Sequence, residues 1–297
     1  MKKNAQAFAF YLVIPFIFII SILPWPILFV VSDFIFVIIY YLIRYRRNVV
    51  RVNLTNSFPE KSAKEIKKIE FRFYRYFTDI TFETFKMFTI SAKQRFLRGK
   101  MDDAAIALFE DLYSKHKSII MITGHYGNWE YTPLGNPLYP GYQTYAIYHP
   151  LSNPYFNKWM CYVRMRTGCK LYTMTGTLKG MLSNLDKTTV TAFISDQSPN
   201  PKGALWFQFL NQDTPVFNGP EKIAQKLNMA VVYGSMQRVK RGCYAFRAKL
   251  ICEDASKTEP GEITEKHLRL LESDIQKAPE YWLWTHRRWK HKRPEAR

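Results

Sequence analysis

The chain has 297 residues, of which 47% are apolar, enough for one large or two small domains with a sizeable core. Its formal charge of +19 indicates an anionic partner, such as nucleic acid, an anionic membrane surface or an acidic protein. The four cysteines have neither C-x-x-C spacing nor histidines at zinc-finger spacing. This argues against a disulfide framework and a zinc finger, and it favours reduced structural thiols.

Two long apolar runs come first in the chain: residues 7–23, and residues 27–43, which only Asp33 interrupts. Each run is about 17 residues long, near the lower limit for a membrane-spanning helix. The first is too long for a signal-peptide core and no A-x-A cleavage site follows it; a buried core helix is the alternative. A cluster of arginines after the second run indicates the cytoplasmic side. We therefore expect residues 1–43 to be a membrane anchor, as one span or a shallow hairpin, and residues 44–297 to form a cytosolic domain.

Helices and strands are predicted to alternate through the rest of the chain. Ser62 and Glu65 form an S-x-x-E capping box that opens a long helix, and another helix is expected from Asp102 or Asp103 to about Tyr113. The alternation that follows predicts an α/β domain whose mostly parallel central sheet is flanked by helices. Strands are expected at residues 118–122, 143–149, 170–174, 188–195, 229–236 and 244–251, and helices at residues 128–134, 154–167, 177–185, 220–228 and 264–276.

The segment GHYGNWE, which contains His125 and Glu130, follows the first of these strands. Ligands of α/β sheets bind beyond the carboxyl ends of the strands. An imidazole there accepts a proton near neutral pH, and a carboxylate on its other ring nitrogen would fix its orientation and tautomer. A turn at Gly127 lets Glu130 face back toward His125; a glutamate that caps a helix beside a packed histidine is the alternative.

The sequence offers no nucleophile to accompany His125. It contains no G-x-S-x-G segment, no cysteine near the histidine, no H-E-x-x-H segment and no glycine-rich phosphate loop. We therefore expect His125 to activate a substrate hydroxyl directly, without a metal or a cofactor.

Further segments follow GHYGNWE in a recognisable order: YHPLSNP, RMRTG, LKGML, SDQSP and PEYWLWTHRRWKHKRP. Together they resemble the bacterial lipid A biosynthesis acyltransferases, a family within the lysophospholipid acyltransferase superfamily. GHYGNWE matches the family's H-x4-D/E signature, in its G-H-x-G-N-W-E form, in full, and the resemblance covers nearly the whole chain. There are departures: His149 stands where arginine is usual, the segment before LKGML lacks an arginine, and TPVFNG matches a T-x-x-G segment only loosely.

The resemblance implies a glycerophospholipid acyltransferase-like fold on the cytoplasmic face of the cell inner membrane. It implies acyl carrier protein as partner and donor, through an acyl-phosphopantetheine thioester, and a lipid A precursor in the membrane as acceptor, through the hydroxyl of a hydroxyacyl chain. His125 would be the base, and Glu130 would orient and charge-stabilise its imidazolium. The predicted substrate-binding residues are Asn153, Arg164, Arg166, Asp196, Gln197, Arg287 and Arg288.

These substrate contacts have alternatives. Arg164, Arg166 or backbone amides would stabilise developing charge or bind acceptor phosphates. Asp196, at a strand end, would position a partner, or it caps a turn. Asn153 would contact substrate, or it caps the helix that starts at Pro154.

Other functions compete with this interpretation. The acceptor could be another glycerophospholipid, an aminolipid or a glycolipid, or water could attack in a thioesterase. A nucleic-acid binder would need a basic module with stacking aromatic residues. THRRWKHKR is the one such stretch, and a single basic tail is typical of solvated or membrane-facing segments, so we expect no nucleic-acid partner.

Overall fold

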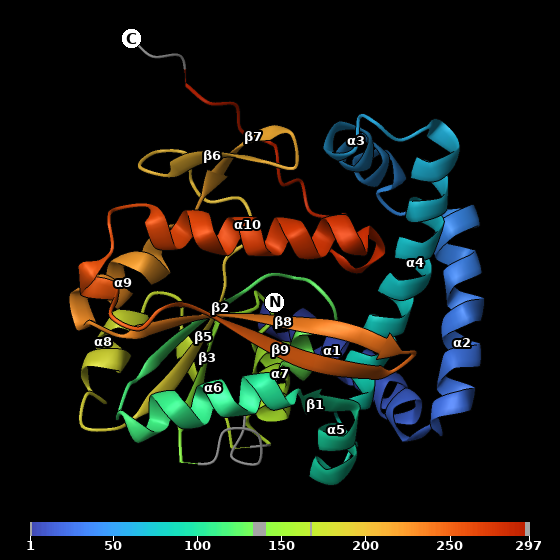
Figure 1. Cartoon of the computed structure of the whole chain (residues 1–297). Helices are drawn as coiled ribbons and strands as arrows, with labels where there is room; N and C mark the ends of the chain where they lie inside the picture. Colours follow the sequence, from blue (N-terminus) through green and yellow to red (C-terminus); the bar gives the residue numbers. More distant parts are fainter. Residues whose placement is uncertain (1, 133–140, 167, 295–297) are drawn as a thin grey trace.

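The structure, a computed structural model, describes residues 2–132, 141–166 and 168–294 of the chain. Within these ranges, the strands of the main sheet are β1 (Gly99–Met101), β2 (Ile119–Thr123), β3 (Gln143–Tyr148), β4 (Lys170–Thr173), β5 (Thr189–Ile194), β8 (Ala230–Lys240) and β9 (Cys243–Cys252). Their order across the sheet is β1-β9-β8-β2-β5-β3-β4, and neighbours run parallel except β8 and β9 (Figure 1). The predicted α/β fold with a mostly parallel central sheet is confirmed.

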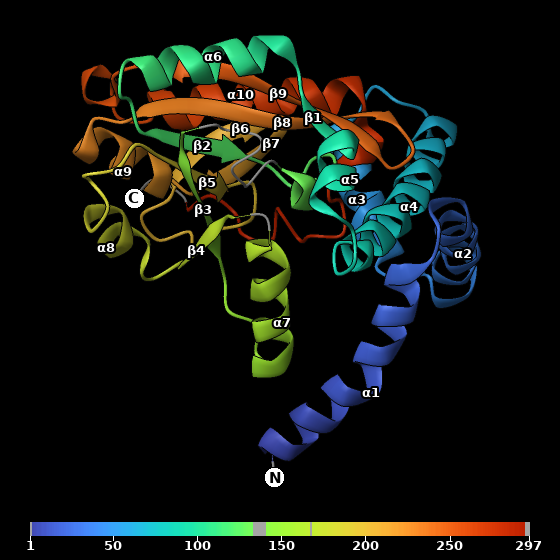
Figure 2. The same ribbon diagram turned by 90° about the horizontal axis from the view of Figure 1, so that it is seen from below.

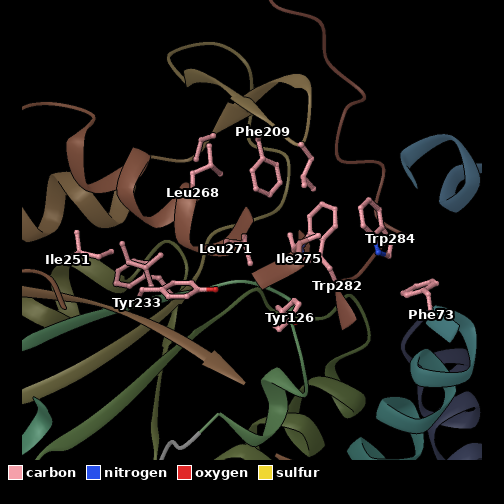
Figure 3. Close-up of a cluster of buried hydrophobic side chains, with 14 of the residues drawn as sticks. Phe73, Tyr126, Phe209, Tyr233, Ile251, Leu268, Leu271, Ile275, Trp282 and Trp284 are labelled. Carbon is pink, nitrogen blue, oxygen red and sulfur yellow. The ribbon is translucent and has the colours of Figure 1, made fainter. Parts of the chain in front are cut away.

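Helices cover both faces of this sheet and enclose two apolar cores. On one face lie α6 (Asp103–Ser114) and α7 (Pro154–Met165), and on the other α8 (Thr177–Leu182), α9 (Gly219–Leu227) and α10 (Glu262–Lys277) (Figure 1). Every residue of β2 is buried, and successive side chains of a strand point to opposite faces. Ile119 and Met121 therefore join the core with α6 and α7, while Ile120 and Ile122 join the core beneath α10. Figure 3 shows part of this second core, with Leu268, Leu271 and Ile275 of α10.

The N-terminal part of the chain is helical. It comprises α1 (Lys2–Ile22), α2 (Trp25–Val37), which continues as the π-helix Ile38–Ile43, α3 (Arg47–Ser57), α4 (Ala63–Lys86) and α5 (Ala92–Arg98). The predicted capping box is confirmed at the start of α4, where the Ser62 hydroxyl accepts from the Glu65 N–H and the Glu65 carboxylate accepts from the Ser62 N–H. α2 lies along α4 at the side of the sheet (Figure 1), whereas α1 extends away from the sheet with α7 beside it (Figure 2).

Two segments differ from the sequence-based predictions. β6 (Leu205–Phe209) and β7 (Gln212–Val216) form an antiparallel hairpin that the pattern does not indicate. Its turn residues, Leu210 and Asn211, both have positive φ, but glycine, the usual signal of such a turn, is absent from this pair. The helix expected over residues 128–134 is a single 3-10 turn, Trp129–Tyr131, within the described residues; residues 133–140 lie outside them.

Candidate active site

His125 and Asp196 meet because of the register between two neighbouring strands. β2 and β5 run parallel and end opposite each other, with Thr123 paired to Ile194. His125 and Asp196 each lie two residues beyond that pair, at the carboxyl edge of the sheet where α/β proteins bind their ligands. His125 Nδ1 lies 2.6 Å from Asp196 Oδ1, and the His125 backbone N–H donates to Asp196 Oδ2 over 2.7 Å. Two contacts thus fix the imidazole and its backbone against one carboxylate.

The environment of Asp196 keeps this carboxylate ionised. Asp196 is buried, which by itself would raise its pKa, but the charge of His125 and hydrogen bonds from His125 and Trp282 lower the pKa well below its ordinary value. Trp282 Nε1 donates to Asp196 Oδ2 over 2.8 Å. Because an ionised carboxylate only accepts, Nδ1 of His125 carries the hydrogen of the shared bond and Nε2 is left to accept a proton. Nε2 faces the Gln197 side-chain nitrogen at 3.4 Å.

Glu130 does not hold the ring of His125 as the spacing suggests. Its carboxylate forms a two-pronged ion pair with Arg164 of α7, at 3.1 Å from Nε and 2.5 Å from Nη2. The expected α-helical turn after Asn128 is a 3-10 turn, and the acceptor at Nδ1 comes instead from Asp196 on the neighbouring strand. Burial would raise the pKa of Glu130, but Arg164 foremost, then Arg95 and His125, lower it.

The Glu130–Arg164 pair lines a cavity of about 60 Å³ at the edge of the sheet. Trp129, whose ring stands edge-on to His125 with the ring centres 5.0 Å apart, lines the same cavity. Thr132 contributes a buried hydroxyl that has no hydrogen-bond partner among the described residues. The cavity therefore combines a cation, an anion and an unpaired hydroxyl beside the histidine.

The loop that carries His125 is braced by the C-terminal segment, far away in sequence. The Gly127 N–H donates to the Tyr281 carbonyl over 3.0 Å, and the Leu283 N–H donates to the His125 carbonyl over 3.1 Å. Gly127 has φ +61°, and a Cβ there would lie 1.8 Å from the Met236 carbonyl oxygen, so only glycine fits. GHYGNWE and the C-terminal motif thus form one structural unit, and Trp282 and Trp284 lie together within it (Figure 3).

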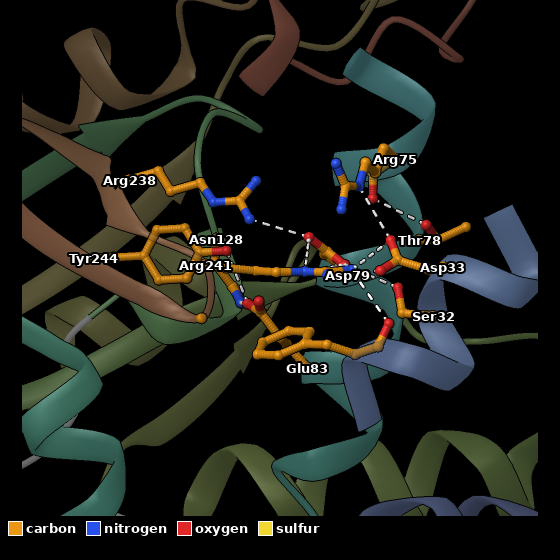
Figure 4. Close-up of polar contacts among 12 residues, drawn as sticks. Ser32, Asp33, Arg75, Thr78, Asp79, Glu83, Asn128, Arg238, Arg241 and Tyr244 are labelled. Carbon is orange, nitrogen blue, oxygen red and sulfur yellow. Dashed lines mark hydrogen bonds and ion pairs between the residues drawn. The ribbon is translucent and has the colours of Figure 1, made fainter. Parts of the chain in front are cut away.

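A buried carboxylate lies behind the same loop. Glu83 of α4 accepts from the Asn128 side-chain amide over 2.6 Å and from the Tyr244 hydroxyl over 2.8 Å, both at Oε2 (Figure 4). Burial, only partly offset by these hydrogen bonds, raises the pKa of Glu83 to about 7. Sequence patterns give no reason to link Glu83 with Asn128, because a helix and a loop 45 positions apart meet here.

Three of the remaining predicted site residues contact the protein itself. Asn153 caps α7, accepting from the Tyr155 N–H over 3.0 Å, and Arg166 donates to the carbonyls of Met87 and Phe88. Arg288 is fully buried and donates to the Pro215 carbonyl over 2.8 Å. Burial lowers its pKa to about 10. Arg287 is exposed. The substrate roles of these residues remain predictions.

The fold and the site define an α/β protein with a histidine–carboxylate pair at the carboxyl edge of a mostly parallel sheet. The model of the bacterial lipid A biosynthesis acyltransferase family matches residues 3–291, and the chain belongs to this family. The predicted resemblance is therefore confirmed, and membership supports an acyltransferase of lipid A biosynthesis.

Three curated proteins illustrate the similarity. The chain is 24% identical over 271 residues to a lipid A biosynthesis palmitoleoyltransferase of Escherichia coli strain K12, covering 90% of this chain and 86% of that protein. A lipid A biosynthesis acyltransferase of Shigella flexneri matches with the same identity and coverage. A lipid A biosynthesis acyltransferase of Haemophilus influenzae is 20% identical over 240 residues, covering 80% of this chain and 74% of that protein.

Proposed function

We propose that this protein transfers a fatty acyl chain from an acyl carrier protein thioester to a hydroxyl of a lipid A precursor, the hydroxyl of a hydroxyacyl chain. We place the reaction on the cytoplasmic face of the inner membrane. Family membership supports the reaction class. The His125–Asp196 contact of 2.6 Å carries the chemistry, since it leaves one ring nitrogen ready to accept the proton of a hydroxyl. The charge of +19 suits an acidic carrier protein and an anionic lipid surface.

The transfer needs one base and one charge-stabilising group. Nε2 of His125 takes the proton of the acceptor hydroxyl as the oxygen attacks the thioester carbonyl. The C–O bond forms, the C–S bond breaks, and the imidazolium returns its proton to the phosphopantetheine thiolate. Asp196 stabilises the transient imidazolium, as the buried aspartate of a catalytic triad does. The carboxylate that acts on His125 therefore belongs to Asp196, after the neighbouring strand. Glu130, the glutamate of the H-x4-E motif, has a different role.

We propose that the role of Glu130 is to position Arg164. Glu130 holds the guanidinium in one orientation by two parallel contacts, which is the geometry in which arginine recognises planar anions most selectively. Side-chain exposures of 28% for Arg164 and 13% for Glu130 leave the arginine the more accessible of the two. Arg164 would then stabilise the thioester oxyanion or a phosphate of the acceptor, while Glu130 positions it.

The test is a transfer assay with purified enzyme, labelled acyl carrier protein and separate acceptors in mixed micelles. The acceptors are a lipid A precursor, a glycerophospholipid, an aminolipid and an unrelated glycolipid. We expect ester formation on the lipid A precursor and its loss in His125→Ala. Transfer to one of the other acceptors alone would overturn the acceptor assignment but keep the chemistry. Release of free fatty acid without any acylated acceptor would identify a thioesterase and overturn the proposal.

A further inference from the structure

The two N-terminal helices present a large exposed apolar surface, whose contact with water is unfavourable. Both are long and apolar enough to cross a membrane by length and composition, and only 11% and 22% of their most apolar windows are buried. An exposed apolar surface of this extent marks a contact with lipid or with another protein. The large side chains that protrude from it are Phe8, Tyr11, Leu12, Val13, Phe16, Phe18, Ile19 and Ile22 of α1, and Ile27, Val30, Phe34, Val37, Tyr41, Leu42 and Ile43 of α2 and its extension.

Both ends of α1 are hydrogen-bonded to the body of the protein. Near its start, the Gln6 side chain donates to the Ser152 carbonyl and the Asn153 side chain donates to the Gln6 carbonyl, each over 3.0 Å. At its other end, Lys86 of α4 donates to the Leu23 carbonyl over 2.7 Å. The helix between these attachments is about 25 Å long at 1.5 Å per residue, short of the roughly 30 Å of a hydrocarbon layer.

These attachments are incompatible with a crossing by α1. Ser152 and Asn153 lead into α7, which carries Lys158 and Arg164 and is connected to the central sheet through β3. If α1 crossed the membrane, the start of α7 would have to reach the far side with it. The charged groups of α7 would then enter hydrocarbon, which is costly for lysine and arginine.

α2 is fixed to the body at its middle by a charge cluster (Figure 4). Asp33, the one charge in its apolar run, pairs with Arg75 of α4 at 3.0 Å and with Arg241 of the β8–β9 hairpin at 2.8 Å. The neighbouring Ser32 donates to Asp79 over 2.9 Å, and Asp79 also accepts from Arg241. A crossing by α2 would carry these arginines and the end of the hairpin to the centre of the bilayer.

The inner face of α2 belongs to the core of the domain. Leu28, Phe36 and Tyr40 are buried, and the last two share one core with Phe73 and Trp284. Only the outer face of α2 is therefore open to lipid.

We infer that neither helix crosses the membrane, and that α1 and the outer face of α2 lie in a single leaflet of a phospholipid bilayer. The protein is then monotopic: its N-terminus and its catalytic domain face the same side, and the exposed Arg44 and Arg46 meet anionic headgroups of that leaflet. This inference concerns the mode of insertion and does not depend on the donor or the acceptor of the reaction.

The direct test is protease accessibility of an N-terminal tag in sealed inside-out inner-membrane vesicles, in which the cytoplasmic face points outward. The full-length chain carries one cleavable tag before Met1 and a different one after Arg297. We expect both tags to be removed from intact vesicles at similar rates. Removal of the C-terminal tag with protection of the N-terminal tag, until detergent is added, would show a single span. Labelling of Pro24→Cys, between the two helices, by a membrane-impermeant maleimide from the periplasmic side would show two spans. Either result would overturn the inference.

A second measurement tests whether lipid is the occupant of the surface. Phe16→Asp and Phe34→Asp place a charge on the outer faces of α1 and α2, where the side chains are 63% and 65% exposed. Leu185→Asp is the matched control, at a side chain that is 62% exposed and lies just after α8. We expect partition onto anionic phospholipid vesicles to fall roughly tenfold or more for each phenylalanine variant and to be unchanged for the control. Unchanged partition in all three variants would mean that another protein, and not lipid, binds this surface, and it would overturn the lipid assignment.

Discussion

Asp196, 71 positions beyond His125 in the chain, holds both the ring nitrogen Nδ1 and the backbone N–H of that histidine. The carboxylate five positions away, Glu130, holds an arginine instead. The candidate site is thus built from two strand ends and a helix, with one carboxylate for the base and another for a cation. This division can be tested residue by residue.

Asp196→Asn is expected to reduce transfer strongly while the protein stays folded. The amide keeps the shape of the side chain but removes its charge, and its NH₂ group favours the wrong tautomer of His125. A loss of roughly 10²- to 10⁴-fold in kcat is expected, as for the loss of a general base. Comparison with Asp186→Asn, which lies outside the site in the turn after α8, controls for the substitution itself. A loss of less than tenfold would remove Asp196 from the mechanism.

Glu130 and Arg164 are expected to act as one unit. Glu130→Gln, Arg164→Gln and the double variant should all lose transfer to a similar extent, because either single change leaves the other group without its partner. The coupling energy from this cycle should be about 0.5–3 kcal/mol, the range found for contacting residues. Arg166→Gln removes hydrogen bonds that, among the residues the structure describes, go to the backbone carbonyls of Met87 and Phe88, and it should combine additively with Glu130→Gln. Losses that simply multiply for Glu130 and Arg164 would rule out the pair as a functional unit.

Glu83 should make a contribution to stability that falls as pH rises toward 7, opposite in sign to the contributions of His267 and His286, whose pKa values burial lowers to about 4. Its pKa is raised from 4.5 to about 7, so the folded state holds a proton that the unfolded state has lost. The stabilisation is complete below about pH 4.5 and disappears as pH rises through 7, and between these two values each step of one in pH lowers the unfolding free energy by about 1.4 kcal/mol. Glu83→Gln, which stays neutral, lacks this contribution, so between these pH values its unfolding free energy should rise relative to that of the wild type by about 1.4 kcal/mol for each step of one in pH. Glu110→Gln, on the exposed side of α6, should leave the curve unchanged, and a curve equally steep in both variants would contradict the assignment.

Two N-terminal truncations should behave differently. Removing residues 1–24 deletes α1, including the core side chain Ile17, and should give a folded but somewhat less stable protein with weaker membrane binding. Removing residues 1–43 also deletes Phe36 and Tyr40 from the core and Asp33 from its ion pairs. Each lost core side chain typically costs about 2–5 kcal/mol, so the loss of Phe36 and Tyr40 together is comparable to the whole stability of a domain, about 5–15 kcal/mol. Thermal unfolding in detergent is the measurement, and equal melting temperatures would show that α2 is a dispensable anchor.

Much of the fold follows from local pattern. The capping box at Ser62 starts α4, and the apolar segment before His125 is β2. Both can be predicted because helix caps and buried strands are determined by residues close together in the sequence. The β6–β7 hairpin escapes prediction because Leu210 and Asn211 adopt positive φ without a glycine to signal it. Local pattern leaves a membrane helix and a buried core helix both open for α2, because both of its faces are apolar in sequence, and only the structure shows that one face belongs to the core.

The sequence predicts which residues form the site better than it predicts which of them contact each other. His125, Glu130, Arg164 and Asp196 are all found at the carboxyl edge of the sheet or next to it. The contact between His125 and Asp196 depends on the register of β2 against β5. The spacing of residues within one segment gives no information about that register. One signal does exist: Asp196 follows a predicted strand just as His125 does, and strand ends of a parallel sheet converge.

If His125 is the base for acyl transfer, removal of its imidazole must slow ester formation while the protein stays folded. The rate of ester formation from labelled acyl carrier protein to the lipid A precursor is compared between wild type, His125→Ala and His116→Asn. His116 is an exposed histidine in the turn between α6 and β2, and asparagine tolerates its positive φ. We expect a loss of roughly 10²- to 10⁴-fold for His125→Ala and no loss for His116→Asn. A His125→Ala protein that is folded and retains more than about a tenth of the wild-type rate would contradict the assignment of His125 as the base.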